Sequence, residues 1–188
     1  MGRHETEVLS VARTSPRIAV VADTHSRPHA GGLEGLRGGD FDAILHAGDI
    51  GARAVIDDLE TIAPTYAVRG NIDARAPDTP DSLCLDVEIR DQLSLRILLT
   101  HIAVRGPRLR KDARTLAKAC GADMVVCGHS HVPLMVRDSG FVVFNPGSMG
   151  PRRFRLPITY GVMELKRTGW QLEHVDCTTQ KKWTPPQA

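Results

Sequence analysis

Residues that commonly bind metal ions or phosphate stand directly after several apolar segments of this chain. Near its middle, the apolar run 124–126 is followed shortly by Gly128, His129, Ser130 and His131. Two imidazoles this close together suit a metal site, because imidazole nitrogen is a ligand for first-row transition metals. A single histidine at such a place is more often structural, so the interpretation depends on the other apolar segments.

Four further apolar segments end in the same way. Their ends carry Asp23 and His25, then Asp49, then Asn71 and Asp73, and finally His101. In open α/β sheets, ligands bind beyond the carboxyl ends of the strands, so these scattered side chains are expected to converge. A glycine precedes each of Asp49, Asn71 and His129, which lets the backbone turn sharply and approach a bound ion.

The residue types narrow the kind of site. Carboxylate and amide oxygens suit harder cations, and imidazole suits transition metals. The absence of cysteine from the set argues against a structural zinc site. Seven ligands are too many for one tetrahedral ion, so the sequence favours two metal ions that share one carboxylate.

Short apolar segments rich in Val, Ile and Leu predict strands at 17–22, 43–45, 65–68, 93–99, 124–126, 141–144, 160–165 and 171–175. Helical spacing predicts helices at 52–61 and 107–119, the second closed by Gly121. Residues 78–90 alternate in polarity and are left open as a further strand. This order predicts an α/β protein with a mixed sheet or two packed sheets flanked by helices.

Composition is typical of one globular domain of 188 residues, with 41 % hydrophobic and 24 % charged residues and a net charge of +2. We expect a mobile leader at 1–16, the domain at 17–180 and a tail at 181–188. No apolar segment approaches the ~20 residues that span a bilayer, and no secretory signal precedes the domain, so we expect a cytoplasmic protein without membrane contact. The four cysteines show no framework spacing and are expected to be reduced.

The ordered set D-x-H, G-D, G-N-x-D, H and G-H-x-H resembles the calcineurin-like metallophosphoesterase superfamily. The stretches VADTH, VRGNID, GHSHVP and FNPGSMGPRR are also similar to its YfcE-like phosphodiesterase branch. The resemblance runs from Asp23 to His131. It implies an α/β four-layer metallophosphoesterase sandwich, in which two mixed β-sheets are flanked by helices, with a dinuclear metal centre.

The resemblance also implies a role for each residue. Asp23, His25 and His131 would bind the first metal; Asn71, His101 and His129 the second; and Asp49 would bridge them. The implied activity is hydrolysis of small phosphodiesters by a hydroxide that bridges two divalent ions. Mn²⁺ suits the mixed ligand set, while Fe, Ni, Zn and Mg stay open. Catalytic residues would be Asp49, Asn71 and Asp73, and the candidate substrate contacts are Asn71, Arg105 and Arg153.

Two positions depart from the pattern. Ile72 stands where many members of the superfamily have a histidine that serves as general acid, and Ile102 stands where the branch has a glycine followed by a second histidine. Both departures remove proton donors and leave the metal ligands intact. Without a general acid, we expect a strong preference for good leaving groups such as aryl esters.

Two alternatives stay open at this point. One is a phosphomonoesterase or nucleotidase that uses the same site. The other is a metal-binding scaffold for protein interactions, since the fold also serves a retromer subunit that recruits partners. Short basic clusters without a broad basic stripe argue against long nucleic acids as partners. A homo-oligomer, either a dimer or a larger assembly, is also left open.

Overall fold

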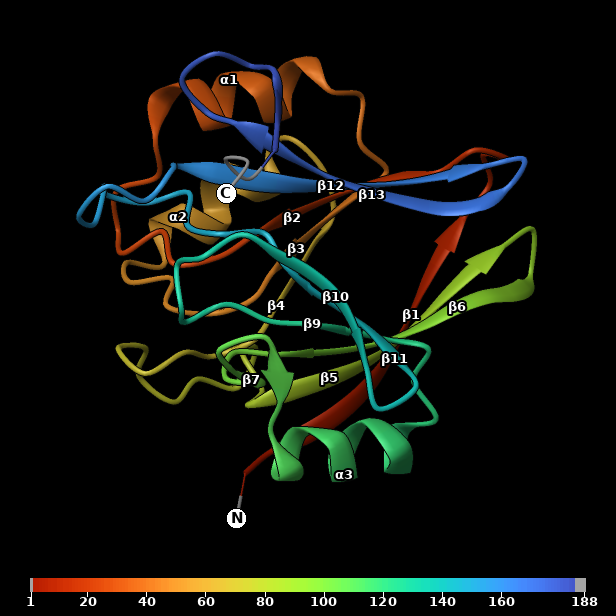
Figure 1. The fold of residues 1–188 in the computed structure, drawn as a ribbon. Helices are drawn as coiled ribbons and strands as arrows, with labels where there is room; N and C mark the ends of the chain where they lie inside the picture. The colour runs from red at the N-terminus through yellow and green to blue at the C-terminus, as the bar shows by residue number, and fades with distance from the viewer. Residues whose placement is uncertain (1, 185–188) are drawn as a thin grey trace.

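Two six-stranded sheets form the body of the protein, and a computed structural model describes residues 2–184 of it (Figure 1). In sheet order, the first sheet holds β1 (His4–Val11), β5 (Ser82–Ile89), β6 (Gln92–Thr100), β9 (Met124–Val126), β11 (Phe141–Asn145) and β10 (Leu134–Asp138). The second holds β14 (Lys182–Trp183), β13 (Gly169–Asp176), β12 (Thr159–Lys166), β2 (Arg17–Val21), β3 (Ala43–His46) and β4 (Thr65–Ala67). A small hairpin pairs β7 (Val104–Arg105) with β8 (Arg108–Leu109).

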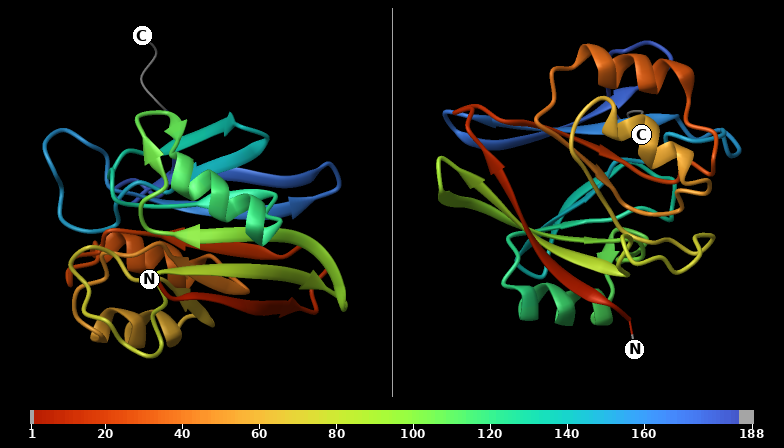
Figure 2. Two further views of the ribbon diagram at one scale, coloured as in Figure 1. Left: turned by 90° about the horizontal axis from the view of Figure 1, so that it is seen from below. Right: turned by 180° about the vertical axis from the view of Figure 1, so that it is seen from behind.

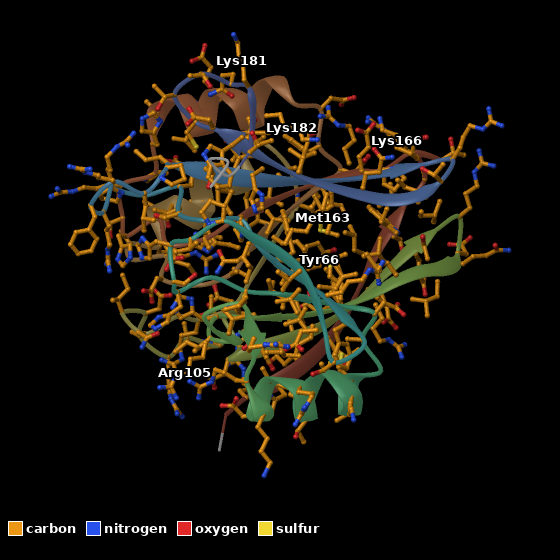
Figure 3. All side chains as sticks on the ribbon, viewed as in Figure 1. Tyr66, Arg105, Met163, Lys166, Lys181 and Lys182 are labelled. Carbon is orange, nitrogen blue, oxygen red and sulfur yellow. A yellow bond between two sulfur atoms is a disulfide. The ribbon has the colours of Figure 1, made fainter. Side chains whose placement is uncertain are left out.

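The main core lies between the two sheets. Ile18 and Leu45 from the second sheet pack with Leu85 and Ile97 from the first, and all four side chains are fully buried. Met163 on β12 belongs to the same cluster, and Tyr66 on β4 packs against its edge (Figure 3). Burial of this apolar surface is the dominant stabilising contribution that holds the sheets face to face.

Helices cover the outer face of each sheet. Helices α1 (Ala30–Gly38) and α2 (Ala54–Glu60) pack through Leu36 and Leu59 on the second sheet, whereas α3 (Lys111–Cys120) packs through Ala113 and Ala117 on the first. Two further views show α1 and α2 on one side of the molecule and α3 on the opposite side (Figure 2). The predicted four-layer sandwich with two mixed sheets is therefore confirmed.

The direction of the central strands sets the position of the candidate site. Strands β2, β3 and β4 run parallel to one another, and so do β6, β9 and β11 in the other sheet. The loops that leave the carboxyl ends of β2, β3, β4, β6 and β9 carry the predicted metal ligands. They meet at one end of the sandwich, as expected of ligand sites in α/β sheets.

The expected mobile leader, residues 1–16, is instead a strand over half of its length. β1 pairs in parallel with β5 over eight residues, and its Leu9 and Val11 side chains are buried in the main core. The strand begins with four consecutive polar residues, 4–7, so the sequence gives no apolar run that would predict it. At the other terminus, Lys182 and Trp183 form β14 within the expected tail, while residues 185–188 lie outside the described part of the chain.

Two helical expectations also change. Helix α1 was missed because glycines make up nearly half of its residues and lower its helix propensity. The helix expected at 107–119 begins only at Lys111, since the preceding residues form the β7–β8 hairpin. Gly121 closes that helix in the left-handed conformation at φ 67°, as predicted. No helix within residues 2–184 combines the length and apolar character that crossing a membrane requires.

The expectation of four reduced thiols is wrong for one pair. A disulfide joins Cys84 on β5 to Cys120 at the end of α3, with their Cα atoms 6.0 Å apart. These cysteines are 36 residues apart and meet only because α3 packs on the first sheet, so their spacing gives no signal. Cys127 and Cys177 are free and buried.

Candidate metal centre

Six of the seven predicted metal ligands lie in two neighbouring groups, each made of one aspartate and two histidines. We call Asp23, His25 and His131 the first triad, and Asp49, His101 and His129 the second triad. Within each triad, the candidate ligand atoms all lie within 4.8 Å of one another. His25 Nε2 is 3.7 Å from Asp49 Oδ2, so the two triads adjoin and Asp49 faces both.

Unusual backbone conformations bring these side chains together. Asp23, His25, Asp49, His129 and His131 have φ between 48° and 69°, in the left-handed region that residues with a side chain rarely adopt. Such a conformation costs about 1–3 kcal/mol per residue and persists only where the surrounding structure enforces it. Five cases at the ends of three strands indicate a site whose geometry is fixed before any ligand binds.

Glycine is needed at two of the positions that the sequence singled out. Gly48 has a φ of 87°, which turns the chain directly before Asp49. Gly70 lies so close to Asp49 that a Cβ there would overlap the Asp49 backbone nitrogen. The loop after β4 can therefore pack directly against the Asp49 loop only if it has no side chain at that point.

Hydrogen bonds orient the ligand atoms toward the centre. His101 Nδ1 donates to the Ala47 carbonyl over 2.7 Å, which leaves Nε2 facing Asp49 Oδ1 at 3.2 Å. Asp23 Oδ2 accepts the His129 backbone N–H at 3.0 Å, and Oδ1 faces His131 Nε2 at 3.4 Å. Histidine ligands of metals are commonly oriented by such a bond on their other nitrogen.

The donor set fits divalent metal ions. Asp23 Oδ1 and His101 Nε2 are buried, and neither has a hydrogen-bond partner among the described residues. Buried polar atoms without a partner are rare and call for an explanation such as an ion. Each triad offers one carboxylate oxygen and two imidazole nitrogens, a combination that binds several first-row metals.

The two aspartates differ in their affinity for protons. Burial raises the pKa of Asp23 to about 7, and the charge of Asp49 adds to this although His101 opposes it. Burial also acts to raise the pKa of Asp49, but His101 and the Ile72 backbone N–H outweigh it and hold that pKa well below its usual range. The pKa of His101 is raised, because its neighbours Asp49, Ala47 and Asp23 together outweigh its burial.

His46 joins the two ligand loops, a role that the sequence left open. Its Nε2 donates to Thr24 Oγ1 over 2.9 Å, and its Nδ1 accepts the Gly48 N–H at 3.2 Å. The Thr24 hydroxyl in turn donates to the Ile50 carbonyl at 3.0 Å. Complete burial lowers the pKa of His46 to about 4, so it is neutral and keeps this pattern at neutral pH.

Asp73, predicted to be catalytic, instead has a positioning role in this structure. Its carboxylate accepts the backbone N–H groups of Ile50, Gly51 and Gly70 at 2.8–3.0 Å. Both oxygens are thereby used to tie the Asp49 loop to the loop after β4. A carboxylate engaged in this way fixes the loops around the second triad.

The FNPGSMG stretch also fixes ligand loops, a role that its turn chemistry did not suggest. Asn145 donates to the Gly128 carbonyl at 2.7 Å and to Ser130 Oγ at 3.1 Å, which holds the loop that carries His129 and His131. Ser148 Oγ donates to the Asp23 carbonyl at 2.9 Å. These partners belong to loops that are 15 or more residues away in the sequence, so only the folded arrangement identifies them.

The remaining predicted residues lie at different distances from the triads. The Asn71 side chain is exposed and makes no hydrogen bond within residues 2–184, while its own loop contacts Asp49 through the Ile72 N–H at 3.2 Å. Arg153 Nη2 lies 3.2 Å from His25 Nε2, at the edge of the first triad. Arg105 lies on the β7–β8 hairpin and lines a separate cavity.

Comparison with known proteins agrees with this combination of a two-sheet fold and a metal centre at one end. The profile of the calcineurin-like phosphoesterase superfamily domain matches residues 17–168. A probable metallophosphoesterase of Methanothermobacter thermautotrophicus is 33 % identical over 162 residues, which cover 83 % of this chain and 88 % of that protein. The chain therefore belongs to the calcineurin-like phosphoesterase superfamily, and its class is that of metal-dependent phosphoesterases.

Solved structures share the fold at lower identity. Vacuolar protein sorting 29 from Cryptosporidium parvum superposes with a TM-score of 0.71 at 19 % identity, covering 90 % of this chain and 95 % of that one. YfcE, a phosphoesterase from E. coli, gives a TM-score of 0.60 at 22 % identity, with 89 % and 97 % covered. At these identities, the likeness concerns the fold.

Proposed function

We propose that this protein is a phosphodiesterase that uses two divalent metal ions, one held by each triad and both contacted by Asp49. One observation carries the proposal, namely the two adjoining triads with Asp49 Oδ2 only 3.7 Å from His25 of the first triad. When bound, such a pair of ions clamps a phosphoryl group and generates hydroxide near neutral pH. Mn²⁺ is the proposed ion, since the ligands mix oxygen and nitrogen.

The charge of the site supports a diester substrate. Two divalent cations exceed the two carboxylates Asp23 and Asp49 by only two charges, and an attacking hydroxide reduces that excess further. A small positive excess matches the single negative charge of a phosphodiester better than the two charges of a monoester. The excess also attracts the anionic substrate from solution.

Two side chains are proposed to contact the substrate phosphate. Arg153 lies at the edge of the first triad and presents a guanidinium that can donate two parallel hydrogen bonds to phosphoryl oxygens. Asn71 has an exposed side chain at the second triad and would complete the ligands there or donate to a phosphoryl oxygen.

The leaving group receives no proton from residue 72. The Ile72 side chain is 52 % exposed beside the second triad, where it can neither donate nor accept a proton. A general acid typically contributes 10²–10⁴-fold to such a reaction. We therefore expect fast hydrolysis only for esters whose leaving group departs without a proton.

The test compares hydrolysis of bis(p-nitrophenyl) phosphate with hydrolysis of p-nitrophenyl phosphate. Metal-stripped protein is assayed with each divalent ion added back, alongside Asp49→Ala and the matched surface control Asp58→Ala. The proposal expects diester turnover that Mn²⁺ restores, that Asp49→Ala loses and that Asp58→Ala retains. It is contradicted if no ion restores diester turnover.

A phosphomonoesterase remains the second candidate, and one observation favours it. The positive charge of Arg153 at the first triad would help to bind a dianionic monoester. Faster turnover of p-nitrophenyl phosphate than of the diester in the same assay would replace the first candidate with the second.

A further inference from the structure

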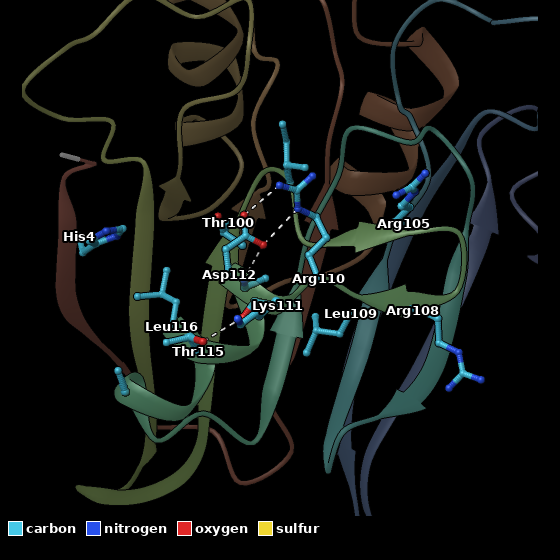
Figure 4. Close-up of a pocket in the computed structure, with 13 residues that line it drawn as sticks. His4, Thr100, Arg105, Arg108, Leu109, Arg110, Lys111, Asp112, Thr115 and Leu116 are labelled. Carbon is cyan, nitrogen blue, oxygen red and sulfur yellow. Dashed lines mark hydrogen bonds and ion pairs between the residues drawn. The ribbon is translucent and has the colours of Figure 1, made fainter.

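A cavity of about 1290 Å³ opens between the start of α3, the β7–β8 hairpin and the ends of β1 and β6 (Figure 4). Its apolar lining includes Ile102, Leu109, Ala113, Leu116 and Ala119, and its basic lining includes Arg105, Arg108, Arg110 and Lys111. Ligand cavities typically combine a largely apolar wall with a few polar groups in this way. Arg105, which the sequence indicated as a substrate contact, lies in this cavity, whereas none of the roles given to the triads uses it.

The cavity adjoins the second triad. Ile102 lines it and directly follows His101, whose side chain belongs to the triad. The Arg110 backbone N–H donates to the Ala103 carbonyl at 2.8 Å, which holds the start of α3 against the same loop. The segment of His101 and Ile102 therefore contributes one side chain to the triad and the next one to the cavity.

The charges of the lining favour an anion. Asp112 contributes the one acidic side chain of the described lining, and Arg110 pairs with it at 2.9 Å. Arg108 lies 3.7 Å from Asp138, which is outside the lining. Arg105 and Lys111 form no ion pair within residues 2–184, so their charges are available to a ligand.

We propose that this cavity is a second substrate subsite, which binds one organic arm of the phosphodiester, an arm that carries an apolar ring and a further anionic group. The apolar wall of α3 would contact the ring, while Arg105 and Lys111 would bind the anion. A nucleotide arm with a terminal phosphate combines both features. The inference rests on the proposed function, because the scissile phosphate would lie at the triads.

The size of the cavity agrees with this class of ligand. Pockets for drug-sized ligands are about 300–1,000 Å³, so this cavity of about 1290 Å³ is large enough for a bulky arm of nucleotide size. In this arrangement one phosphate would lie at the metal ions and the other at Arg105 and Lys111. A simple aryl diester would occupy only the ion-proximal part.

The test measures binding by titration calorimetry of the Mn²⁺-loaded protein. Thymidine 3′,5′-bisphosphate is compared with thymidine 5′-monophosphate for the wild type, for Arg105→Gln combined with Lys111→Gln, and for Arg167→Ala. Arg167 follows Lys166 on the β12–β13 turn, on the opposite side of the molecule from Arg105 (Figure 3). Since hydrogen bonds to charged groups contribute strongly, the double variant should bind the bisphosphate about tenfold or more weakly.

The expected result is a loss that is much larger for the bisphosphate than for the monophosphate, with Arg167→Ala matching the wild type. Equal losses for both nucleotides, or no loss, would overturn the subsite. Hydrolysis of bis(p-nitrophenyl) phosphate by the wild type tests the proposed function separately. Selective loss of bisphosphate binding without any hydrolysis would sustain the subsite and reject the phosphodiesterase.

Discussion

The first and second triads contain the same residue types, one aspartate and two histidines, but they hold protons on different atoms. In the first triad, burial raises the pKa of Asp23 to about 7 and lowers that of His131 to about 4, so the proton stays on the carboxyl group. In the second triad, the pKa of Asp49 is lowered and that of His101 is raised, so the proton stays on the imidazole.

This difference follows from position. Asp23 is fully buried at the end of β2 and accepts one backbone N–H, whereas Asp49 lies 3.2 Å from His101 and accepts the Ile72 N–H. Both triads are close to neutral when empty, which avoids several unpaired buried charges. In the proposed centre, a metal ion would therefore displace a proton from a different atom in each triad.

The largest expected effect is on catalytic turnover, and it should differ between Asp49, which faces both triads, and Asp23, which belongs to one. Asp49→Ala should lose diester turnover by more than the roughly 10–100-fold that outer-shell partners contribute, and excess Mn²⁺ should not restore it, because Asp49 faces both triads. Asp23→Ala should recover part of its activity in excess Mn²⁺, since the second triad stays intact. Assays across a Mn²⁺ series measure this, and identical behaviour of the two variants would remove the distinction.

A proton donor restored at position 72 should assist departure of the leaving group beside the second triad and should have no effect at the first triad. Ile72→His places an imidazole on the loop that contacts Asp49, and a general acid contributes at least about 10²-fold in favourable cases. Turnover of an alkyl aryl diester with a poor leaving group should rise, while that of bis(p-nitrophenyl) phosphate should change little. Ile72→Leu serves as the control, and equal rates for both variants would count against a missing general acid.

Removal of positioning contacts should weaken the triads one at a time. Asp73→Ala removes three hydrogen bonds from the loops around Asp49 and should lower metal affinity of the second triad by about 10–100-fold. Ser148→Ala removes the bond to the Asp23 carbonyl and the bond that Ser148 Oγ accepts from the Gly150 N–H. It should weaken the first triad by less, because only one of these two bonds reaches a ligand residue. Calorimetric titration measures Mn²⁺ binding to the two triads as two separate steps. If both variants weakened both steps equally, Asp73 and Ser148 would not each position a different triad.

The smallest expected effect is the pH dependence of Mn²⁺ binding to the first triad. Asp23 with a pKa of about 7 is largely protonated at pH 6, so Mn²⁺ affinity of the first triad should fall about tenfold per pH unit below 7 and level off above it. Titrations at pH 6 in buffers of different ionisation enthalpy count the released protons. Asp23→Asn should release about one proton fewer than the wild type, and an unchanged count would place the proton elsewhere.

Much of the fold was predictable because strands buried on both faces have a recognisable sequence pattern. The segments that became β2, β3, β9 and β11 are continuous apolar runs, as expected for strands covered on both faces. β1 was not predictable, since only Leu9 and Val11 of its eight residues are buried. The glycine-rich α1 was hidden for a similar reason, because packing of Leu36 against the second sheet supports a helix that its own propensity does not.

The candidate site was predictable only at its centre. Each triad residue follows a strand, so parallel strand ends were enough to bring Asp23, Asp49 and His129 to one place. His46, Asp73 and Ser148 act through backbone groups of other loops, and nothing in their spacing indicates those partners. Asp73 was assigned to catalysis because it stands two residues after Asn71, whereas its contacts depend on how two loops pack.

The central claim is that each triad binds one divalent ion, and a count of bound ions tests it most directly. Metal-stripped wild type, Asp23→Ala and Asp49→Ala are equilibrated with Mn²⁺ at pH 8, dialysed, and analysed for metal content and for folded structure by circular dichroism. We predict two ions per chain for the wild type, one for Asp23→Ala and fewer than one for Asp49→Ala. A single ion in the wild type, retained unchanged in Asp23→Ala, would contradict the claim.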